Sequence, residues 1–173
     1  MTNKQINKLK VGGFTLIEFL LYISITGMMV VTLSGLFFMV VQSRVKHQAI
    51  TEVDQQSIEV INKITQSLRN AESINLPAQG ASAVSLSLDV VDVSDDPTVF
   101  DLSSGAIQMT EGVGSPVALT NSNVTISSIL FENLSRTNTP GVVRISFTVS
   151  HINPENRQEF AYSRTFYATA SLR

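Results

Sequence analysis

The chain has 173 residues, of which 43% are hydrophobic, a formal net charge of −2 and no cysteine. One modest domain is therefore expected, and a disulfide framework, a thiolate metal site and lipid attachment through cysteine are excluded for this sequence. The near-neutral charge, with no basic patch, argues against a nucleic-acid partner.

The first predicted element is a long apolar helix. Residues 1–13 form a short polar head that carries three lysines, and residues 14–41 are predominantly apolar. A bilayer core needs roughly 20 apolar residues as helix, and this run supplies about 28, or roughly 42 Å at 1.5 Å per residue. It is longer than the apolar core of a signal peptide. We expect the chain to cross the cytoplasmic membrane once, with the basic head inside and the C-terminal part exported.

Glu18 is the one charged residue in this run. An ionised acid at the bilayer centre costs about 2.5–3.5 kcal/mol on insertion scales, and less near a helix end. Glu18 is therefore either an interfacial acid that tolerates its position or an acid with a positive partner. No basic residue lies between Lys10 and Arg44. Cleavage before Phe14 would create an α-amine, mostly protonated at neutral pH, one helical turn from Glu18.

The segment "GFTLIE" at residues 13–18, after a basic head and before a long apolar helix, closely resembles the class III signal of type IV prepilins and type II secretion pseudopilins. The resemblance implies cleavage after Gly13 by a prepilin peptidase, which also methylates the new N-terminus at Phe14. It implies that Glu18 sets the register of the assembling subunit. The preceding glycines discourage helix, so the scissile bond can lie extended in a protease cleft.

The same resemblance implies the partners of the chain. These are the prepilin peptidase and N-methyltransferase, other pilin subunits that contact the N-terminal helix, and an assembly-platform membrane protein. The cytoplasmic membrane holds the helix first, and the pilus or pseudopilus holds it afterwards.

From Gln42 onward the pattern becomes amphipathic. Apolar residues recur at intervals of three and four or their sums, which predicts that one helix continues over residues 42–75 and is ended by Asn75 and Pro77. The stripe is expected to pack on the chain's own sheet, and a coiled-coil partner is the alternative. Its members are Ile50, Val53, Ser57, Ile61, Ile64, Leu68 and Ala71.

Residues 76–173 are predicted to form a β-rich exported domain. Alternating segments and turn residues predict five or six strands in a mostly antiparallel sheet. They lie at 83–93, 98–110 (a hairpin that turns at Ser-Ser-Gly), 123–134, 142–152 and 160–172.

The expected fold class is therefore α+β, and a long N-terminal helix laid on such a sheet is the lollipop shape of the pilin family. The β-rich part is similar to minor subunits of the PilW or GspJ type. The segments that carry this similarity are "ITQSLRNAESI" at 64–74, "VFDLSSGAIQM" at 99–109 and "RTFYATASLR" at 164–173.

Acidic residues cluster at 89–101, and oxygen-rich loops can bind calcium. Asp89 and Asp92 are expected on opposite faces of a strand, and Asp95-Asp96-Pro97 is typical of a turn. A calcium site at Asp95 and Asp96 is therefore the minor alternative to a solvated turn.

No other chemistry is indicated. Two isolated histidines, His47 and His151, do not predict a zinc site in the absence of cysteine. No nucleophile and base stand at a recognisable spacing, so neither enzyme activity nor a cofactor is expected.

Two functional hypotheses remain. The favoured one is a minor pilin or pseudopilin, cleaved after Gly13, methylated at Phe14 and assembled into a type IV pilus-like or type II secretion filament, where it aids initiation or caps the tip. The alternative is an uncleaved single-pass receptor or adhesin, for which the glycines and Glu18 would be accidental.

Overall fold

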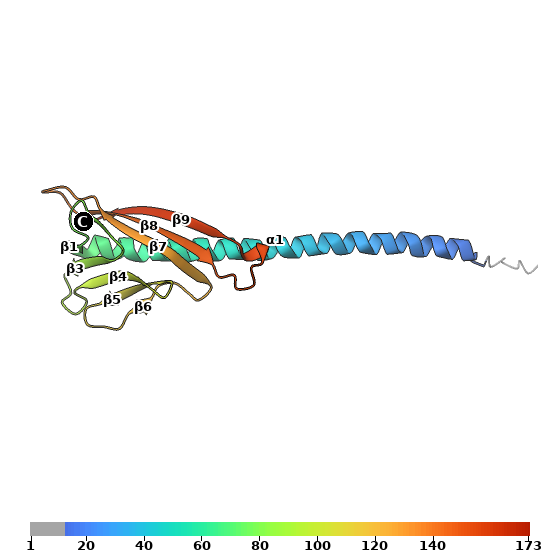
Figure 1. Cartoon of the computed structure of the whole chain (residues 1–173), viewed down its shortest axis with the longest axis horizontal. Helices are drawn as coiled ribbons and strands as arrows, with labels where there is room; N and C mark the ends of the chain where they lie inside the picture. Colours follow the sequence, from blue (N-terminus) through green and yellow to red (C-terminus); the bar gives the residue numbers. More distant parts are fainter. Residues whose placement is uncertain (1–12) are drawn as a thin grey trace, which may run out of the picture. The chain divides into compact units, whose positions relative to one another are not determined.

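The computed structural model describes residues 13–173, so the expected leader up to Gly13 lies outside the described residues except for Gly13 itself (Figure 1). The chain divides into two compact units, Met1–Gln42 and Ser43–Arg173. Helix α1 (Leu16–Asn70) contributes to both units.

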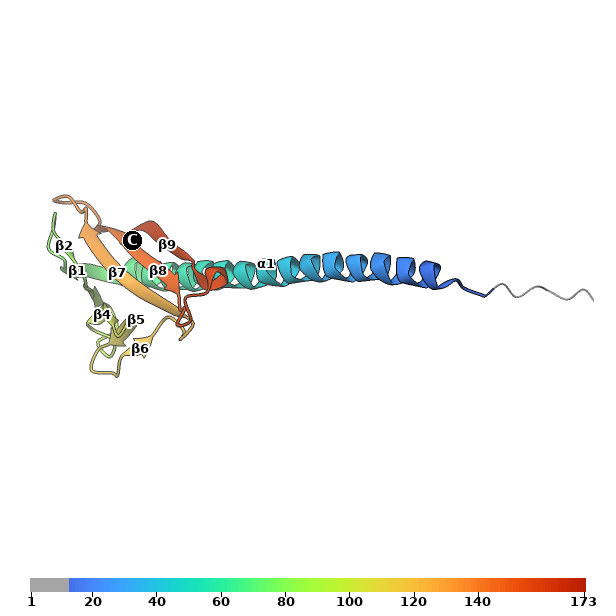
Figure 2. The ribbon, with the colours of Figure 1, turned by 45° about the vertical axis from the view of Figure 1, so that its right-hand side comes forward.

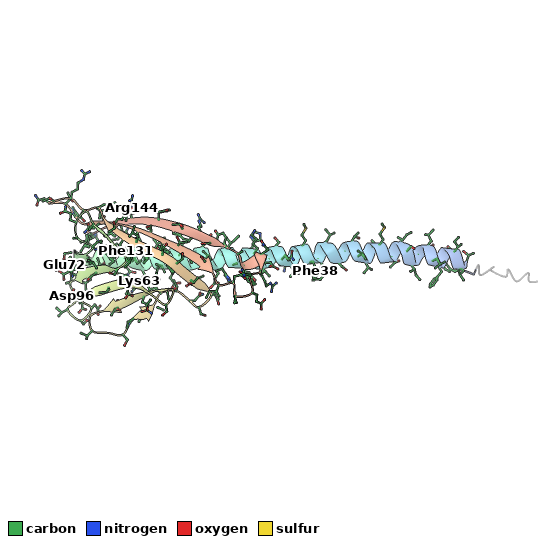
Figure 3. The ribbon with its side chains drawn as sticks, in the orientation of Figure 1. Phe38, Lys63, Glu72, Asp96, Phe131 and Arg144 are labelled. Carbon is green, nitrogen blue, oxygen red and sulfur yellow. The ribbon has the colours of Figure 1, made fainter. Side chains whose placement is uncertain are left out.

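The first unit contains the apolar part of α1. Thr15 starts the helix, because its Oγ1 accepts a hydrogen bond from the amide of Glu18 (3.4 Å) and its carbonyl accepts one from the amide of Phe19 (3.1 Å). Every residue from Gly13 to Arg44 is exposed, and the side chains, Phe38 among them, project freely (Figure 3). An 18-residue window has a mean hydropathy of 2.0, so this helix is long and apolar enough to span a membrane. A helix that is apolar on all sides needs lipid or other apolar helices around it.

In the second unit, α1 buries one stripe of side chains in steps of three and four residues. This confirms that the amphipathic stripe packs on the chain's own fold. Ile50 and Ile61 are only half-buried, and Ala49 and Val60 take the central positions instead. Ser57 is tolerated in the core because its Oγ donates to the carbonyl of Val53 (2.6 Å). The buried members are Ala49, Val53, Ser57, Val60, Ile64 and Leu68.

The predicted helix over 42–75 is wrong in its last five residues. Helix α1 ends at Asn70, and β1 (Ala71–Leu76) follows directly. Strand β1 pairs antiparallel with β3 (Leu86–Val90), which satisfies backbone groups that a longer helix would have bonded internally. Ala71 stays buried, so the apolar spacing continues although the backbone changes.

The strands form two sheets where one was expected, and all pairs are antiparallel, as predicted. The first sheet has the order β1-β3-β4-β5-β6 and the second the order β2-β7-β8-β9 (Figure 2). A short 3₁₀ helix, η1 (Gln158–Phe160), precedes the last strand. The remaining strands are β2 (Ser82–Ala83), β4 (Thr98–Ser103), β5 (Ala106–Glu111), β6 (Val117–Ala118), β7 (Val124–Asn133), β8 (Val142–His151) and β9 (Ser163–Ser171).

The predicted hairpin at 98–110 is confirmed as β4 and β5. Ser103 pairs with Ala106, so the turn consists of Ser104 and Gly105, both with positive φ (52° and 77°). Two-residue turns of this kind match the twist of the flanking strands. A Cβ on Gly105 would lie 2.6 Å from Oγ1 of Thr125 on β7 of the second sheet. Glycine therefore also allows the turn to lie close to β7.

One hydrophobic core joins α1 to both sheets within the second unit. Its largest fully buried side chains are Phe100 on β4, Phe147 on β8 and Phe131 on β7. Phe131 is labelled in Figure 3. The fold is therefore α+β, with the second half of a long N-terminal helix packed on antiparallel sheets.

Candidate functional site

The candidate site lies where α1 begins. Gly13 and Phe14 precede the helix and are exposed, and no atom lies within 4 Å of a Cβ built on Gly13. Neither residue is helical, so the peptide bond between them lies in an exposed stretch that precedes α1.

Glu18 lies in the first turn of α1, where an acidic side chain is favoured by the helix dipole. Its Oε1 accepts a hydrogen bond from the hydroxyl of Tyr22 (3.4 Å). The ring of Tyr22 meets that of Phe14 edge to face, with centroids 5.9 Å apart. Because Phe14, Glu18 and Tyr22 are spaced by four residues, all three lie on one face of the chain.

Tyr22 is the residue that the sequence analysis missed. The spacing of four residues from Glu18 was the available signal, since residues i and i+4 of a helix are neighbours. At this spacing the hydroxyl of Tyr22 can donate a hydrogen bond to the carboxylate of Glu18, as the structure shows.

The electrostatics of this site rest on a single charge. Between Gly13 and Ser43, Glu18 is the only ionisable acid or base other than the phenol of Tyr22. The arrangement can therefore bind a cation at the start of the helix, on the face that carries Phe14.

The acidic loop between β3 and β4 bonds mainly to itself. Asp92 lies in this loop and not on the strand, which corrects the expectation. Its Oδ1 accepts from the amide (3.0 Å) and the hydroxyl (2.8 Å) of Ser94, and these bonds lower the pKa of Asp92. Oδ1 of Asp96 accepts from the amide of Val90 (3.3 Å), and the carbonyl of Asp95 accepts from Thr98 (3.0 Å).

These contacts agree with turn chemistry for Asp95 and Asp96. Within residues 13–173, no group of three His, Cys, Asp or Glu side chains is placed to hold a metal ion.

The two histidines lie closer together than their separation in sequence suggests. His47 and His151 line one shallow surface hollow together with Glu52 and Phe160. The ring of His151 stacks on Phe160 at 5.2 Å, and its Nδ1 lies 2.8 Å from the carbonyl of Ile152. Both of these contacts of the His151 ring are local, with Phe160 and Ile152. His47 is exposed.

Comparison of the chain with protein-family models, curated proteins and solved structures found no significant match.

Proposed function

We propose that the chain is a minor pilin or pseudopilin. A prepilin peptidase cleaves it after Gly13 and methylates the amine of Phe14. Its apolar helix then passes from the cytoplasmic membrane into a type IV pilus-like or type II secretion filament, where the subunit helps to initiate the fibre or caps its tip.

The observation that supports this proposal most strongly is the position of Glu18. It is the only acid in an otherwise apolar, fully exposed helical segment, and it lies one turn after a non-helical Gly13–Phe14 bond. A carboxylate in apolar surroundings is costly unless a positive partner is present. Cleavage at this bond supplies such a partner as an α-amine, either on the same chain or on a neighbouring subunit.

The exposure of the helix supports the same proposal. Side chains from Phe14 to Val41 are 42–79% exposed wherever they are large and apolar. Lipid can cover such a helix first, and neighbouring helices can cover it in a filament. The small residues Gly27 and Gly35 meet no atom within 4 Å, so they leave room for close helix–helix approach.

Mass spectrometry of the membrane-extracted protein tests the cleavage. In a host with an active prepilin peptidase, we expect a chain that begins at Phe14 and carries one added methyl group. Gly13→Val is expected to leave the full-length precursor, because a side chain would enter the protease cleft at the scissile bond. Gly27→Val is the matched control, a glycine of the same segment with equally open surroundings, and is expected to be cleaved. An intact N-terminus in the wild-type chain would favour the uncleaved receptor or adhesin.

A second experiment separates cleavage from assembly. Glu18→Ala is expected to be cleaved and methylated normally, but to remain in the membrane fraction and to be depleted from sheared filaments. Normal incorporation of Glu18→Ala would remove the role assigned to this carboxylate.

A further inference from the structure

The two sheets end in four edge strands, and three of these are poorly suited to pairing. Strands β2 and β6 have two residues each. Strand β1 has two register shifts in its pairing with β3, and Ile74 on β1 lies close to Gly141, the residue before β8. Short, irregular or covered edges are the usual protection against unwanted strand addition.

Strand β9 is the exception. It has nine residues, and all nine pair in unbroken register with β8. It contains no proline, glycine or lysine, and its only charge is Arg164, which pairs with Asp54 on α1 (3.2 Å). It forms the outer margin of the second sheet (Figures 1 and 2).

The backbone groups of β9 that face away from β8 can be assigned. The amide of Leu172 donates to the carbonyl of Gly141 (2.8 Å), and that of His151 donates to the carbonyl of Tyr162 (3.0 Å). Even-numbered residues therefore face β8, since the direction alternates along an antiparallel strand. The N–H and C=O groups of Ser163, Thr165, Tyr167, Thr169 and Ser171 point to the free edge, where none of the described residues pairs with them.

The side chains of these five residues leave that edge accessible. All five are exposed, and four of them are small hydroxyl residues. Thr165 and Ser163 are held toward β8 by hydroxyl contacts to Thr148 (2.9 Å) and Ser150 (3.0 Å). The edge thus offers a row of backbone donors and acceptors without a bulky side chain across it, apart from Tyr167 at its centre.

We propose that β9 is a docking edge that binds an extended acidic segment of a different protein chain by strand addition. The charge along the edge selects this chemistry. Arg69 and Arg173 line a surface hollow at one end, Arg164, which also pairs with Asp54 of α1, lies near the other, and residues 160–173 contain no acidic residue. Carboxylates at the two ends of an added strand would meet these arginines.

A second copy of the same chain fits less well. Antiparallel pairing of two β9 strands about Tyr167 would set Arg164 opposite Ala170 of the other copy, so that no carboxylate of one copy would meet an arginine of the other. The two-fold axis would also reverse the direction of residues 43–70 of α1 from one copy to the other, so their starts at Ser43 would lie on opposite sides of the pair.

Hydrogen exchange on the full chain in detergent micelles tests the proposal. The probe is a nine-residue synthetic peptide of alternating valine and threonine with glutamate at both ends, and its control carries lysine at both ends. We expect the glutamate peptide to slow exchange of the five edge amides of β9 by about tenfold or more, and the lysine peptide to bind at least about tenfold more weakly. Equal effects of both peptides, no protection by either, or a dimer through β9 would overturn the proposal.

Two variants test whether the backbone edge is used. Thr165→Pro combined with Thr169→Pro removes two edge N–H groups and leaves the ladder to β8 intact, since proline is tolerated at such edge positions. Thr165→Val with Thr169→Val is the matched control that keeps both amides. The proline pair is expected to lose the protection and the valine pair to keep it.

A change on the peptide avoids any effect on folding. N-methylation of its amides that face β9 should abolish binding, and methylation of the opposite set should not. Binding that survives methylation of the facing amides would rule out strand addition.

Discussion

At the scale of single residues, the central feature is one carboxylate in an apolar segment. Glu18 has a favourable helix dipole and a long hydrogen bond from Tyr22 (3.4 Å). Neither contact neutralises the charge, so in lipid the group depends on each donor that it has. We therefore expect the hydroxyl of Tyr22 to stabilise the carboxylate of Glu18, in addition to the apolar surface that its ring provides.

If the chain assembles as proposed, Tyr22→Phe should therefore reduce assembly into the filament without affecting cleavage. The substitution removes the hydroxyl that bonds Glu18 and keeps the ring that packs on Phe14. A lost hydrogen bond to a charged group is worth about 1.5–3 kcal/mol, so we expect a clear fall in the ratio of filament-bound to membrane-bound subunit on immunoblots. Tyr162→Phe, at a half-buried tyrosine outside the apolar segment, is the control. An unchanged ratio in Tyr22→Phe would show that the hydroxyl has no part in assembly.

At the scale of elements, α1 carries a buried and an exposed isoleucine that can be compared directly. Ile64 is 0% exposed in the core, and Ile58 is 55% exposed on the same helix. Ile64→Ala should lower the free energy of unfolding by about 2–5 kcal/mol, because it leaves a cavity. Ile58→Ala should change it by less than about 0.5 kcal/mol. Chemical denaturation of both variants in detergent measures the difference, and equal effects would contradict the burial pattern.

The ion pair between Glu132 on β7 and Arg144 on β8 makes the stability of the second sheet depend on pH. Arg144 is labelled in Figure 3. The hydrogen bond from Arg144 lowers the pKa of Glu132, so the folded chain binds a proton less readily than the unfolded chain. The contribution of the pair is fully present above the unfolded pKa of Glu132 and is lost as the pH falls through the folded value.

Arg144→Gln should therefore flatten the decrease in thermal stability between neutral and acidic pH. Arg136→Gln, in the loop between β7 and β8, is the control and should retain the decrease. Thermal unfolding followed at a series of pH values makes the comparison. Identical pH profiles for wild type and Arg144→Gln would assign the acid sensitivity to other carboxylates.

The elements show how far sequence patterns reach. The apolar helix, the buried stripe and the β4–β5 hairpin were predictable, since each depends on residues near in sequence. The end of α1 was not, because β1 exists only through its pairing with β3, and the spacing from Leu68 to Ala71 fits a helix equally well. The division into two sheets also depends on distant pairing. At the site, Gly13, Phe14 and Glu18 were predictable because they belong to one short motif. Tyr22 was not predicted, because its contact with Glu18 exists only once the segment is helical.

At the scale of the whole molecule, the two units have different requirements. No residue between Gly13 and Arg44 is buried, and the buried residues begin at Ala49. The first unit therefore depends on an apolar environment, and the second has a core of its own. The contacts that fix α1 on the sheets also begin there, since Glu52 accepts from Asn121 and Asp54 pairs with Arg164.

A fragment that begins at Ser43 should therefore fold in water without detergent. It retains every buried residue, so we expect dispersed amide signals in NMR spectra and a single cooperative thermal transition. A shorter fragment that begins at Ser57 loses Ala49 and Val53 from the core, together with the contacts of Glu52 and Asp54. It should unfold at a clearly lower temperature or fail to fold, although it is the more polar chain. If the longer fragment aggregated or lacked a cooperative transition, the apolar segment would be part of the folding unit and not only its anchor.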